Sequence, residues 1–161
     1  LDTGWDISRR MIDLNIMALT HLTWLFAPKM RERGRGRILN VASTAAFQPG
    51  PMMAVYFATK AFVLSFSEAL GAELTGSGVT VTALCPGVTE SGFHIAAKTD
   101  GSRWVKGRRI PSSREVAEYG FDAMMSGDAV AIHGTFNYLL AQSVRFTPRN
   151  LVTRIVKTLQ S

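Results

Sequence analysis

The sequence predicts one α/β domain with a parallel sheet of about three strands flanked by helices. Two strand patterns, the continuously apolar Arg37–Ala42 and Val79–Leu84, lie on either side of a helical pattern over Met53–Leu74. A strand, a crossover helix and a second strand imply parallel pairing with a right-handed connection. The 161 residues suit one domain with its own core, and 47% hydrophobic and 19% charged residues are an ordinary balance. We therefore treat residues 1–161 as a single domain.

We expect the first helix over residues 6–30. Its apolar residues recur at three- and four-residue steps and include Ile7, Met11, Leu14, Leu22 and Leu25. Pro28 and the basic run at residues 31–36 are expected to end it. Asn15 lies inside this pattern, where an asparagine weakens a helix slightly unless its side chain has a partner. Asn15 is therefore a candidate functional residue.

The middle of the chain carries the strand–helix–strand unit. The strand at residues 37–42 is too continuously apolar to be half-exposed, which is typical of a central parallel strand. The helix over residues 53–74 has one expected apolar face, formed by Val55, Phe62, Phe66, Ala69 and Leu70. Glycine and small polar residues at 75–78 break this helix before the second strand.

The second half begins with an irregular, polar stretch that runs to Ile110. Long irregular segments in compact domains are usually functional or disordered. Ser112 and Glu115 form a capping-box pattern that opens a helix to about Ser126. A short strand at 129–133 and helices at 136–144 and 148–160 are expected to follow, and residues 145–161 read as a basic, amphipathic tail helix.

Composition excludes several classes of protein. The net charge of +6 would suit anionic partners, but the sequence has no nucleic-acid-binding motif. The single cysteine, Cys85, excludes an internal disulfide framework, and we expect it to be a small buried hydrophobic residue. There is no pattern of metal ligands, signal peptide or membrane-spanning run. We expect a cytoplasmic protein without a bound metal.

Ser43, Tyr56 and Lys60 are the candidate catalytic residues. Ser43 follows the first strand, and after a loop with Pro49 and Gly50 a helix begins that carries Tyr56 and Lys60 four residues apart. That spacing puts the phenol and the ammonium on one face of the helix. Lowering a tyrosine pKa from about 10 to about 7 takes roughly 4 kcal/mol, and a nearby cation in a partly dry pocket supplies much of it.

These features resemble the short-chain dehydrogenase/reductase family. In that family a serine lies thirteen positions before the tyrosine, as Ser43 lies before Tyr56. Asn15 is similar to the family's helix asparagine, Asn40–Ser43 to its Asn-Val-Ser-Ser strand end, and Cys85–Gly87 to its Pro-Gly turn. The resemblance spans roughly residues 11–93 and implies a Rossmann-like, doubly wound parallel sheet.

The resemblance also implies a reaction, in which a nicotinamide cofactor exchanges a hydride with a carbonyl or alcohol substrate. Tyr56 would transfer the proton, and Lys60 would lower the pKa of Tyr56 and hold the nicotinamide ribose. Ser43 would donate a hydrogen bond to the substrate oxygen, as in an oxyanion hole. Asn15 would hold a water in the proton relay.

The same resemblance places the cofactor and the substrate. The nicotinamide would lie beside the backbone of Pro86, Gly87 and Val88, with Thr89 or Ser91 supplying a hydroxyl, and residues 88–110 would form the substrate loop. The family's glycine-rich turn is not found in a strand-to-helix context. The chain is therefore similar to the C-terminal portion of such an enzyme, and we expect it to bind NADP or NAD very weakly or not at all by itself.

Two other functions remain open on this scaffold. A cofactor-independent esterase or hydrolase would use Ser43 as its nucleophile, and an inactive fragment would act only in assembly. By resemblance, the helices at 6–30 and 53–74 would form a homo-oligomer interface. The tail at 145–161 would pack on the domain or a partner subunit, or contact a membrane surface.

Overall fold

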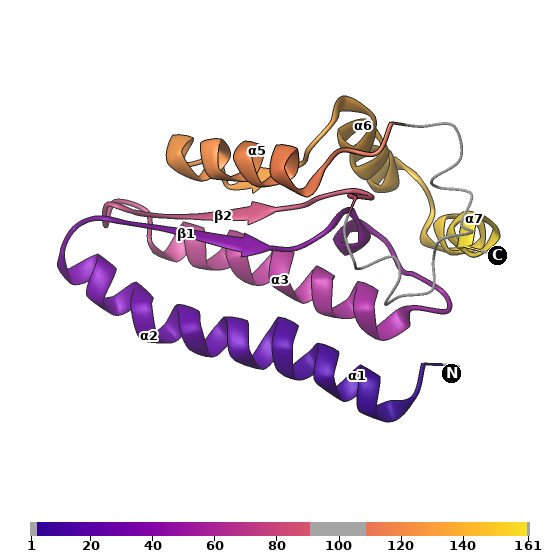
Figure 1. The fold of residues 1–161 in the computed structure, drawn as a ribbon, viewed down its shortest axis with the longest axis horizontal. Coiled ribbons are helices and arrows are strands. Elements are labelled where there is room, and N and C mark those ends of the chain that lie inside the picture. Colours follow the sequence, from indigo (N-terminus) through magenta and orange to yellow (C-terminus); the bar gives the residue numbers. More distant parts are fainter. Residues whose placement is uncertain (1–2, 91–108, 161) are drawn as a thin grey trace.

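The computed structural model describes residues 3–90 and 109–160 (Figure 1). These residues form helices and strands that alternate along the chain. In chain order the elements are α1 (Trp5–Ile12), a π-helical segment (Asp13–Ala18), α2 (Leu19–Glu32), β1 (Gly36–Val41), a 3₁₀ turn (Thr44–Phe47), α3 (Ala54–Glu73), β2 (Val79–Leu84), α5 (Ser113–Ser126), β3 (Val130–Ala131), α6 (Thr135–Ser143), a second 3₁₀ turn (Val144–Phe146) and α7 (Arg149–Gln160).

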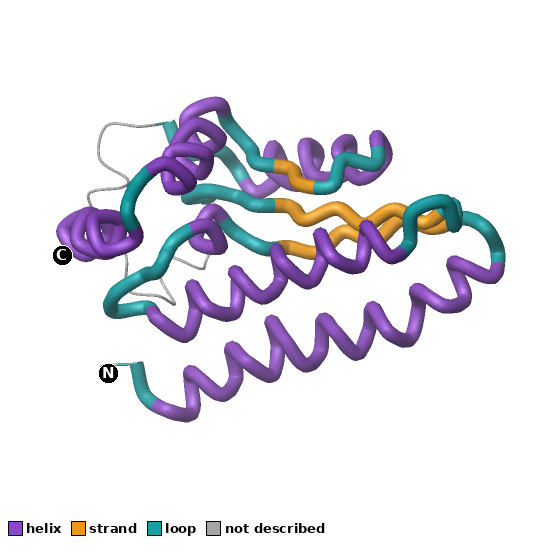
Figure 2. Tube along the Cα trace, turned by 180° about the vertical axis from the view of Figure 1, so that it is seen from behind, coloured by secondary structure: helices purple, strands orange, loops and turns teal. Residues whose placement is uncertain are grey.

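The three strands form one parallel sheet in the order β1-β2-β3. β1 and β2 pair along their whole length, with Gly36 opposite Val79 and Val41 opposite Leu84. Helices α2 and α3 cover one face of the sheet and α5 covers the other (Figures 1 and 2). The predicted fold class, a part of a doubly wound parallel sheet flanked by helices, is confirmed.

The core lies on both faces of β2, whose residues are almost all buried. On one face, Val63 and Leu64 of α3 pack with Ala83. On the other face, Val116 and Ala123 of α5 pack with Leu84. A strand covered on both faces is buried along its length, so even Thr82, one of the two threonines that alternate with valines at its start, is fully buried.

The first helix differs from the prediction in two ways. It contains a π-helical segment at Asp13–Ala18, and it continues through Pro28 to Glu32. A proline inside a helix removes one backbone hydrogen bond, but Thr23 and Ala27 on the neighbouring turn are buried against the domain. Tertiary packing therefore holds α2 together past Pro28.

The buried face of α3 also differs from the prediction. The fully buried residues include two small polar ones, Thr59 and Ser67, while Phe62 is exposed. Phe62 and the half-buried Phe66 stack on each other with ring centroids 5.8 Å apart. The buried side of α3 also carries Phe57, Val63 and Leu64, so it lies on a different side of the helix from the face that the sequence pattern indicated.

The later elements are close to their expected positions, with one exception. The third strand spans only Val130–Ala131 instead of residues 129–133, because only Ala83 and Leu84 of β2 pair with it. Ser112 caps α5 by accepting a hydrogen bond from the Glu115 backbone N–H at 3.2 Å, as the capping-box pattern predicts. No helix among the described residues is both long and apolar enough to cross a bilayer.

Candidate active site

Ser43 lies where β1 ends, next to the end of β2. Its Oγ accepts a hydrogen bond from the Ala45 backbone N–H at 3.1 Å, which caps the 3₁₀ turn. The same Oγ donates to the Pro86 carbonyl at 3.4 Å, and the Thr44 N–H donates to that carbonyl at 2.9 Å. The carboxyl ends of the two strands are thereby joined, and in open parallel sheets this edge is where ligands bind.

Tyr56 and Lys60 lie on the first two turns of α3. A tight turn precedes them, in which the Met53 N–H donates to the Gly50 carbonyl and Met52 has a positive φ of 66°. A non-glycine residue in that region costs about 1–3 kcal/mol, and such strain gathers at functional sites. The turn aims the start of α3, and with it Tyr56, at the end of β1.

The structure brings the three predicted catalytic side chains together. Tyr56 and Ser43 share a side-chain hydrogen bond. The Lys60 Nζ lies 5.9 Å from the centroid of the Tyr56 ring. The arrangement places a phenol, a hydroxyl and an ammonium around one point at the carboxyl edge of the sheet.

The pKa of Tyr56 shifts in the direction opposite to the expected one. Burial raises the pKa of the Tyr56 phenol above its ordinary value, and the hydrogen bond with Ser43 only partly opposes that shift. Burial also lowers the pKa of the Lys60 ammonium. Burial disfavours both the Tyr56 phenolate and the Lys60 ammonium, because each charged form loses contact with water. At this site that cost outweighs the attraction between the two charges across several ångströms.

Lys60 is held by the backbone of β1. Its Nζ donates a hydrogen bond to the Val41 carbonyl at 2.9 Å. An ammonium has three donors, so this bond fixes the side chain and leaves donors for ribose hydroxyls. The residues present therefore fit the nicotinamide–ribose part of a dinucleotide.

Asn15 reaches α3 from the π-helical segment. Its Nδ2 donates to the Thr59 Oγ1 at 3.1 Å, and that hydroxyl donates to the Tyr56 carbonyl at 2.8 Å. Single π turns inside α-helices are frequent at functional sites. Asn15 is thus connected to the backbone of Tyr56, although the contact runs through Thr59 rather than directly to Lys60.

The turn at Pro86–Gly87 lies against α6. A side chain at Gly87 would place its Cβ 2.5 Å from the Asn137 Nδ2, and that amide donates to the His133 carbonyl at 2.8 Å. The Thr89 hydroxyl donates to the Gly87 carbonyl at 3.1 Å. A larger residue at this position would force the Asn137 amide to move. Asn137 was not anticipated from the sequence, where fifty residues separate it from Gly87.

The remaining predicted residues are placed as follows. Val88 and Thr89 follow the turn and are half-buried, whereas Ser91 and most of the expected substrate loop lie outside the described residues. The described ends of that loop meet, because Glu90 N–H donates to the Pro111 carbonyl at 2.9 Å and the Ser113 Oγ to the Glu90 carbonyl at 2.6 Å.

Cys85 is buried beside this site. Burial raises the pKa of its thiol to about 12, which keeps it protonated and unreactive at neutral pH. Among the residues that the structure describes, no three His, Cys, Asp or Glu side chains lie in a group that could hold a metal ion.

Comparison with known proteins identifies the family. A family model described as short chain dehydrogenase matches residues 4–101. The chain belongs to the short-chain dehydrogenase family. The match contains β1, α3, β2 and all three of Ser43, Tyr56 and Lys60.

Two curated members of the family illustrate the relationship. The very-long-chain 3-oxoacyl-CoA reductase of Anas platyrhynchos is 43% identical over 89 residues, which are 55% of this chain and 27% of that protein. The 2-dehydro-3-deoxy-L-rhamnonate dehydrogenase (NAD(+)) of a Sphingomonas strain is 42% identical over 86 residues, 53% of this chain and 34% of that protein. The matched segment thus spans about a quarter to a third of these relatives.

A solved structure agrees with this relationship over more of the chain. The short-chain dehydrogenase from Sphingobium yanoikuyae in complex with NADPH is 29% identical, with a TM-score of 0.74, and the match covers 90% of this chain and 57% of that one. The described chain therefore has the fold of somewhat more than half of that dehydrogenase.

Proposed function

We propose that this chain carries the proton-transfer residues and the nicotinamide side of an NADP- or NAD-dependent carbonyl reductase or alcohol dehydrogenase. The convergence of Ser43 and Tyr56, with the Lys60 ammonium 5.9 Å from the phenol ring, is the observation that carries the proposal. Family membership supports the reaction class. One similar dehydrogenase was solved in complex with NADPH, and the name of another includes NAD(+). These two proteins support a nicotinamide cofactor of either kind.

In the proposed reaction Tyr56 is the general acid for carbonyl reduction. The reduced nicotinamide supplies a hydride to the carbonyl carbon when it is bound. The Ser43 hydroxyl donates a hydrogen bond to the developing oxyanion, and Tyr56 gives that oxygen its phenolic proton. A buried phenol with a raised pKa keeps its proton at neutral pH and still protonates a far more basic alkoxide.

Lys60 and Asn15 support this transfer in different ways. Lys60 stabilises the phenolate that Tyr56 becomes, and it donates to ribose hydroxyls with the hydrogens that the Val41 carbonyl does not take. Asn15 acts through Thr59, whose hydroxyl holds the first turn of α3. The backbone of the turn at Pro86–Gly87 would hold the nicotinamide, and residues 88–110 would determine the substrate.

Nicotinamide mononucleotide tests this proposal, because it lacks the adenosine half whose glycine-rich turn is not found in the sequence. We expect weak binding to the 161-residue chain, seen by saturation-transfer NMR, and its loss in Lys60→Met and Tyr56→Phe. Lys29→Met, which removes an exposed lysine of α2, is the matched control. Binding that survives Lys60→Met and Tyr56→Phe would show that the nucleotide lies elsewhere.

A parallel titration with NADPH and NADH tests the expected weakness of whole-cofactor binding. We expect neither dinucleotide to bind much more tightly than the mononucleotide. Micromolar binding, measured by calorimetry, would mean that this chain contains adenosine-binding contacts that its sequence does not reveal.

No contact in the part of the chain that the structure describes favours the hydrolase alternative. A serine nucleophile needs a base, but the Ser43 Oγ donates to a backbone carbonyl, and the adjacent Tyr56 holds its proton more tightly than a free tyrosine. Chromogenic ester hydrolysis abolished by Ser43→Ala would restore this alternative.

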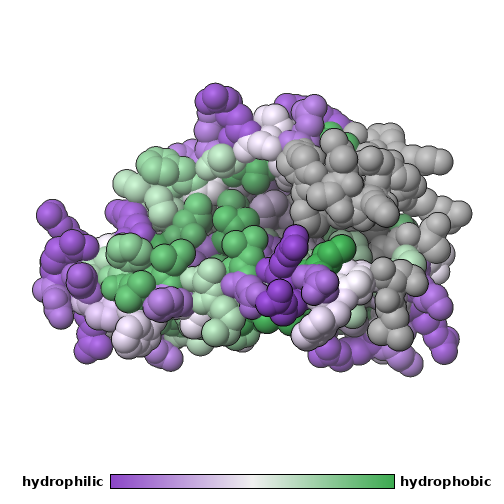
Figure 3. Space-filling model, turned by 60° about the horizontal axis from the view of Figure 1, so that its bottom comes forward, coloured by the Kyte–Doolittle hydropathy of each residue, from purple (hydrophilic) through white to green (hydrophobic). Residues whose placement is uncertain are grey.

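We also propose that the chain assembles through the outer side of α1, α2 and α3. Exposed large apolar residues gather on these helices, namely Trp5, Ile7, Leu14, Met17, Leu22, Trp24, Leu25, Phe26 and Phe62. Figure 3 shows a broad hydrophobic area on this side of the molecule. Surfaces of this kind mark interaction sites. Light scattering after size exclusion should give an assembly, and a monomer would contradict the proposal.

A further inference from the structure

The C-terminal helix α7 has two apolar stripes, of which the domain uses one. Val152 and Val156 are buried against Phe57 and Ala45, beside Tyr56. Leu151 and Ile155 are also four residues apart, so they share a face, but each stays 47% exposed. Packing on the domain therefore accounts for the valines and leaves the second stripe without a partner among the described residues.

An exposed aromatic residue precedes this stripe. Phe146 ends the 3₁₀ turn between α6 and α7, and its side chain is 88% exposed, more than any other large hydrophobic residue that the structure describes. Arg145 and Arg149 lie on either side of it in sequence, and both are exposed. We call Arg145, Phe146, Arg149, Leu151, Arg154 and Ile155 the tail surface.

The charge of this region has one sign. Residues 129–161 contain four basic side chains, Arg145, Arg149, Arg154 and Lys157, and no acidic one. On α7 an open depression is lined by Arg154, Ile155, Thr158 and Leu159, so cationic and apolar groups are interleaved there. A helix with a basic polar face and exposed apolar residues binds in the interface of an anionic bilayer.

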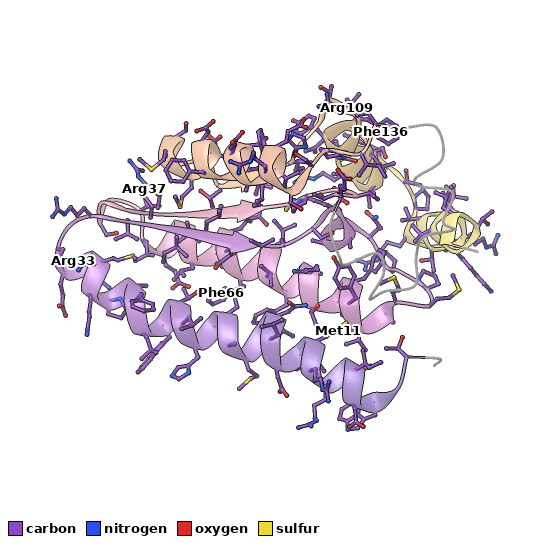
Figure 4. All side chains as sticks on the ribbon, in the orientation of Figure 1. Met11, Arg33, Arg37, Phe66, Arg109 and Phe136 are labelled. Atoms are coloured by element: carbon purple, nitrogen blue, oxygen red, sulfur yellow. The ribbon has the colours of Figure 1, made fainter. Side chains whose placement is uncertain are left out.

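A second copy of the chain fits this surface less well. A two-fold contact places the same patch on both partners, so the arginines would face one another without counter-charges. The other basic cluster of the chain gives a useful contrast. Arg33 and Arg37 lie at the opposite end of the molecule (Figures 1 and 4), and every exposed residue of the stretch 31–37 is charged or glycine.

We propose that the tail surface is a peripheral membrane-binding site, which takes a bilayer containing anionic lipid. Phe146 inserts its ring among the lipid headgroups, Leu151 and Ile155 follow it, and Arg145, Arg149 and Arg154 contact lipid phosphates. The inference does not depend on the proposed reductase activity, because the site is measured by binding alone.

Vesicle flotation of the 161-residue chain tests the proposal. We expect binding to phosphatidylcholine–phosphatidylserine vesicles and not to phosphatidylcholine alone, and weaker binding as salt shortens the screening length from about 10 Å at 0.1 M to about 3 Å at 1 M. Phe146→Ser should weaken partitioning about tenfold, since burying a phenylalanine side chain is worth that much or more. Arg145→Gln with Arg149→Gln should weaken it about thirtyfold, at roughly fivefold per charge.

Matched controls separate a site from general charge attraction. Phe121→Ser removes an exposed phenylalanine of α5 and should leave binding unchanged. Arg33→Gln with Arg35→Gln removes the same charge from the opposite end and should weaken binding by no more than about twofold. Circular dichroism verifies that each variant is folded.

Four results would overturn the proposal. One is the absence of vesicle binding by the unmodified chain. Another is an equal loss for the two arginine pairs, which would mean attraction by net charge. A third is displacement of the vesicles by duplex DNA together with unchanged binding of Phe146→Ser, which would indicate a general polyanion surface. The last is a dimer in sedimentation velocity that Phe146→Ser abolishes, which would make a second copy the partner.

Discussion

A buried hydrogen bond between β1 and α3 holds together the two elements that carry the candidate site. The Asn40 Nδ2 donates to the Ser67 Oγ at 3.0 Å, and that hydroxyl donates to the Val63 carbonyl at 2.7 Å. Asn40 is 5% exposed and Ser67 is fully buried. Asn40 lies three residues before Ser43, and Ser67 lies on the helix that carries Tyr56.

Ser67→Ala should destabilise the chain by about 1–2 kcal/mol. Leaving a buried donor unsatisfied costs about 1–3 kcal/mol, and the better helix propensity of alanine returns roughly 0.5 kcal/mol. For a chain of this size the change corresponds to a fall in melting temperature of roughly 2–8 °C. Urea unfolding followed by circular dichroism measures it, with the slope of free energy against urea unchanged.

Two further variants test whether the loss of stability comes from the hydrogen bond between Asn40 and Ser67. Ser65→Ala removes an exposed hydroxyl from the same helix and should stabilise the chain slightly through helix propensity alone. Asn40→Leu in the Ser67→Ala background replaces both polar partners by apolar groups and should recover part of the lost stability. Two results would contradict the stabilising role of this hydrogen bond. One is a free energy of unfolding for Ser67→Ala as high as for Ser65→Ala, and the other is a double variant that is less stable than Ser67→Ala alone.

Three other predictions follow from the packing and protonation of the site. Gly50→Ala should lower the free energy of unfolding by about 1–3 kcal/mol because its Cβ would overlap the Phe57 ring. Gly71→Ala, inside α3, should raise the free energy of unfolding by about 0.5–1 kcal/mol because a Cβ there would make only ordinary contacts with Val81. Urea unfolding measures both variants, and a Gly50→Ala chain more stable than Gly71→Ala would contradict the close packing at Gly50. Cys85, with its pKa at about 12, should react with iodoacetamide only after unfolding, since at a pH of about 8 about one thiol in ten thousand is ionised; labelling of the folded chain would show that it opens. Because the pKa of Tyr56 is raised, its contribution to stability is complete below the unfolded pKa near 10 and is lost as the pH rises through the higher folded pKa. The phenolate absorbance of the chain relative to Tyr56→Phe should therefore change only above pH 10.0. A transition near neutrality would contradict burial as the dominant cause.

The fold was predictable because its signals are local. β1, α3 and β2 each show the residue pattern of a strand or a helix within a single stretch of sequence. The spacing of Tyr56 and Lys60 places them on one helix face wherever that helix lies. The contact between Ser43 and Tyr56 needed one further step, the rule that parallel strands end at a common edge. The catalytic roles of these residues stay a prediction.

The parts that were missed involve backbone groups and distant residues. The Val41 carbonyl that binds Lys60 has no signature in the side-chain sequence, and neither has the amide of Asn137 against Gly87. The direction of the pKa shift at Tyr56 was wrong because the sequence reveals a charge four residues away but not the depth of burial. The length of β3 depends on how far the chain runs alongside β2, where only Ala83 and Leu84 pair with it, and no local pattern predicts that.

The π-helical segment at Asp13–Ala18 has a consequence for how this protein tolerates changes in length. Each residue of an α-helix advances the chain by about 100°. A residue lost from α2 would turn α1, with Trp5 and Ile7, by that angle around the helix axis, whereas one lost from the wider π-helical turn would restore regular coiling and leave α1 close to its present direction. Asn15 would no longer point at Thr59. A single-residue deletion at this point should therefore be tolerated better than one inside α2, at the cost of the contact between Asn15 and Thr59.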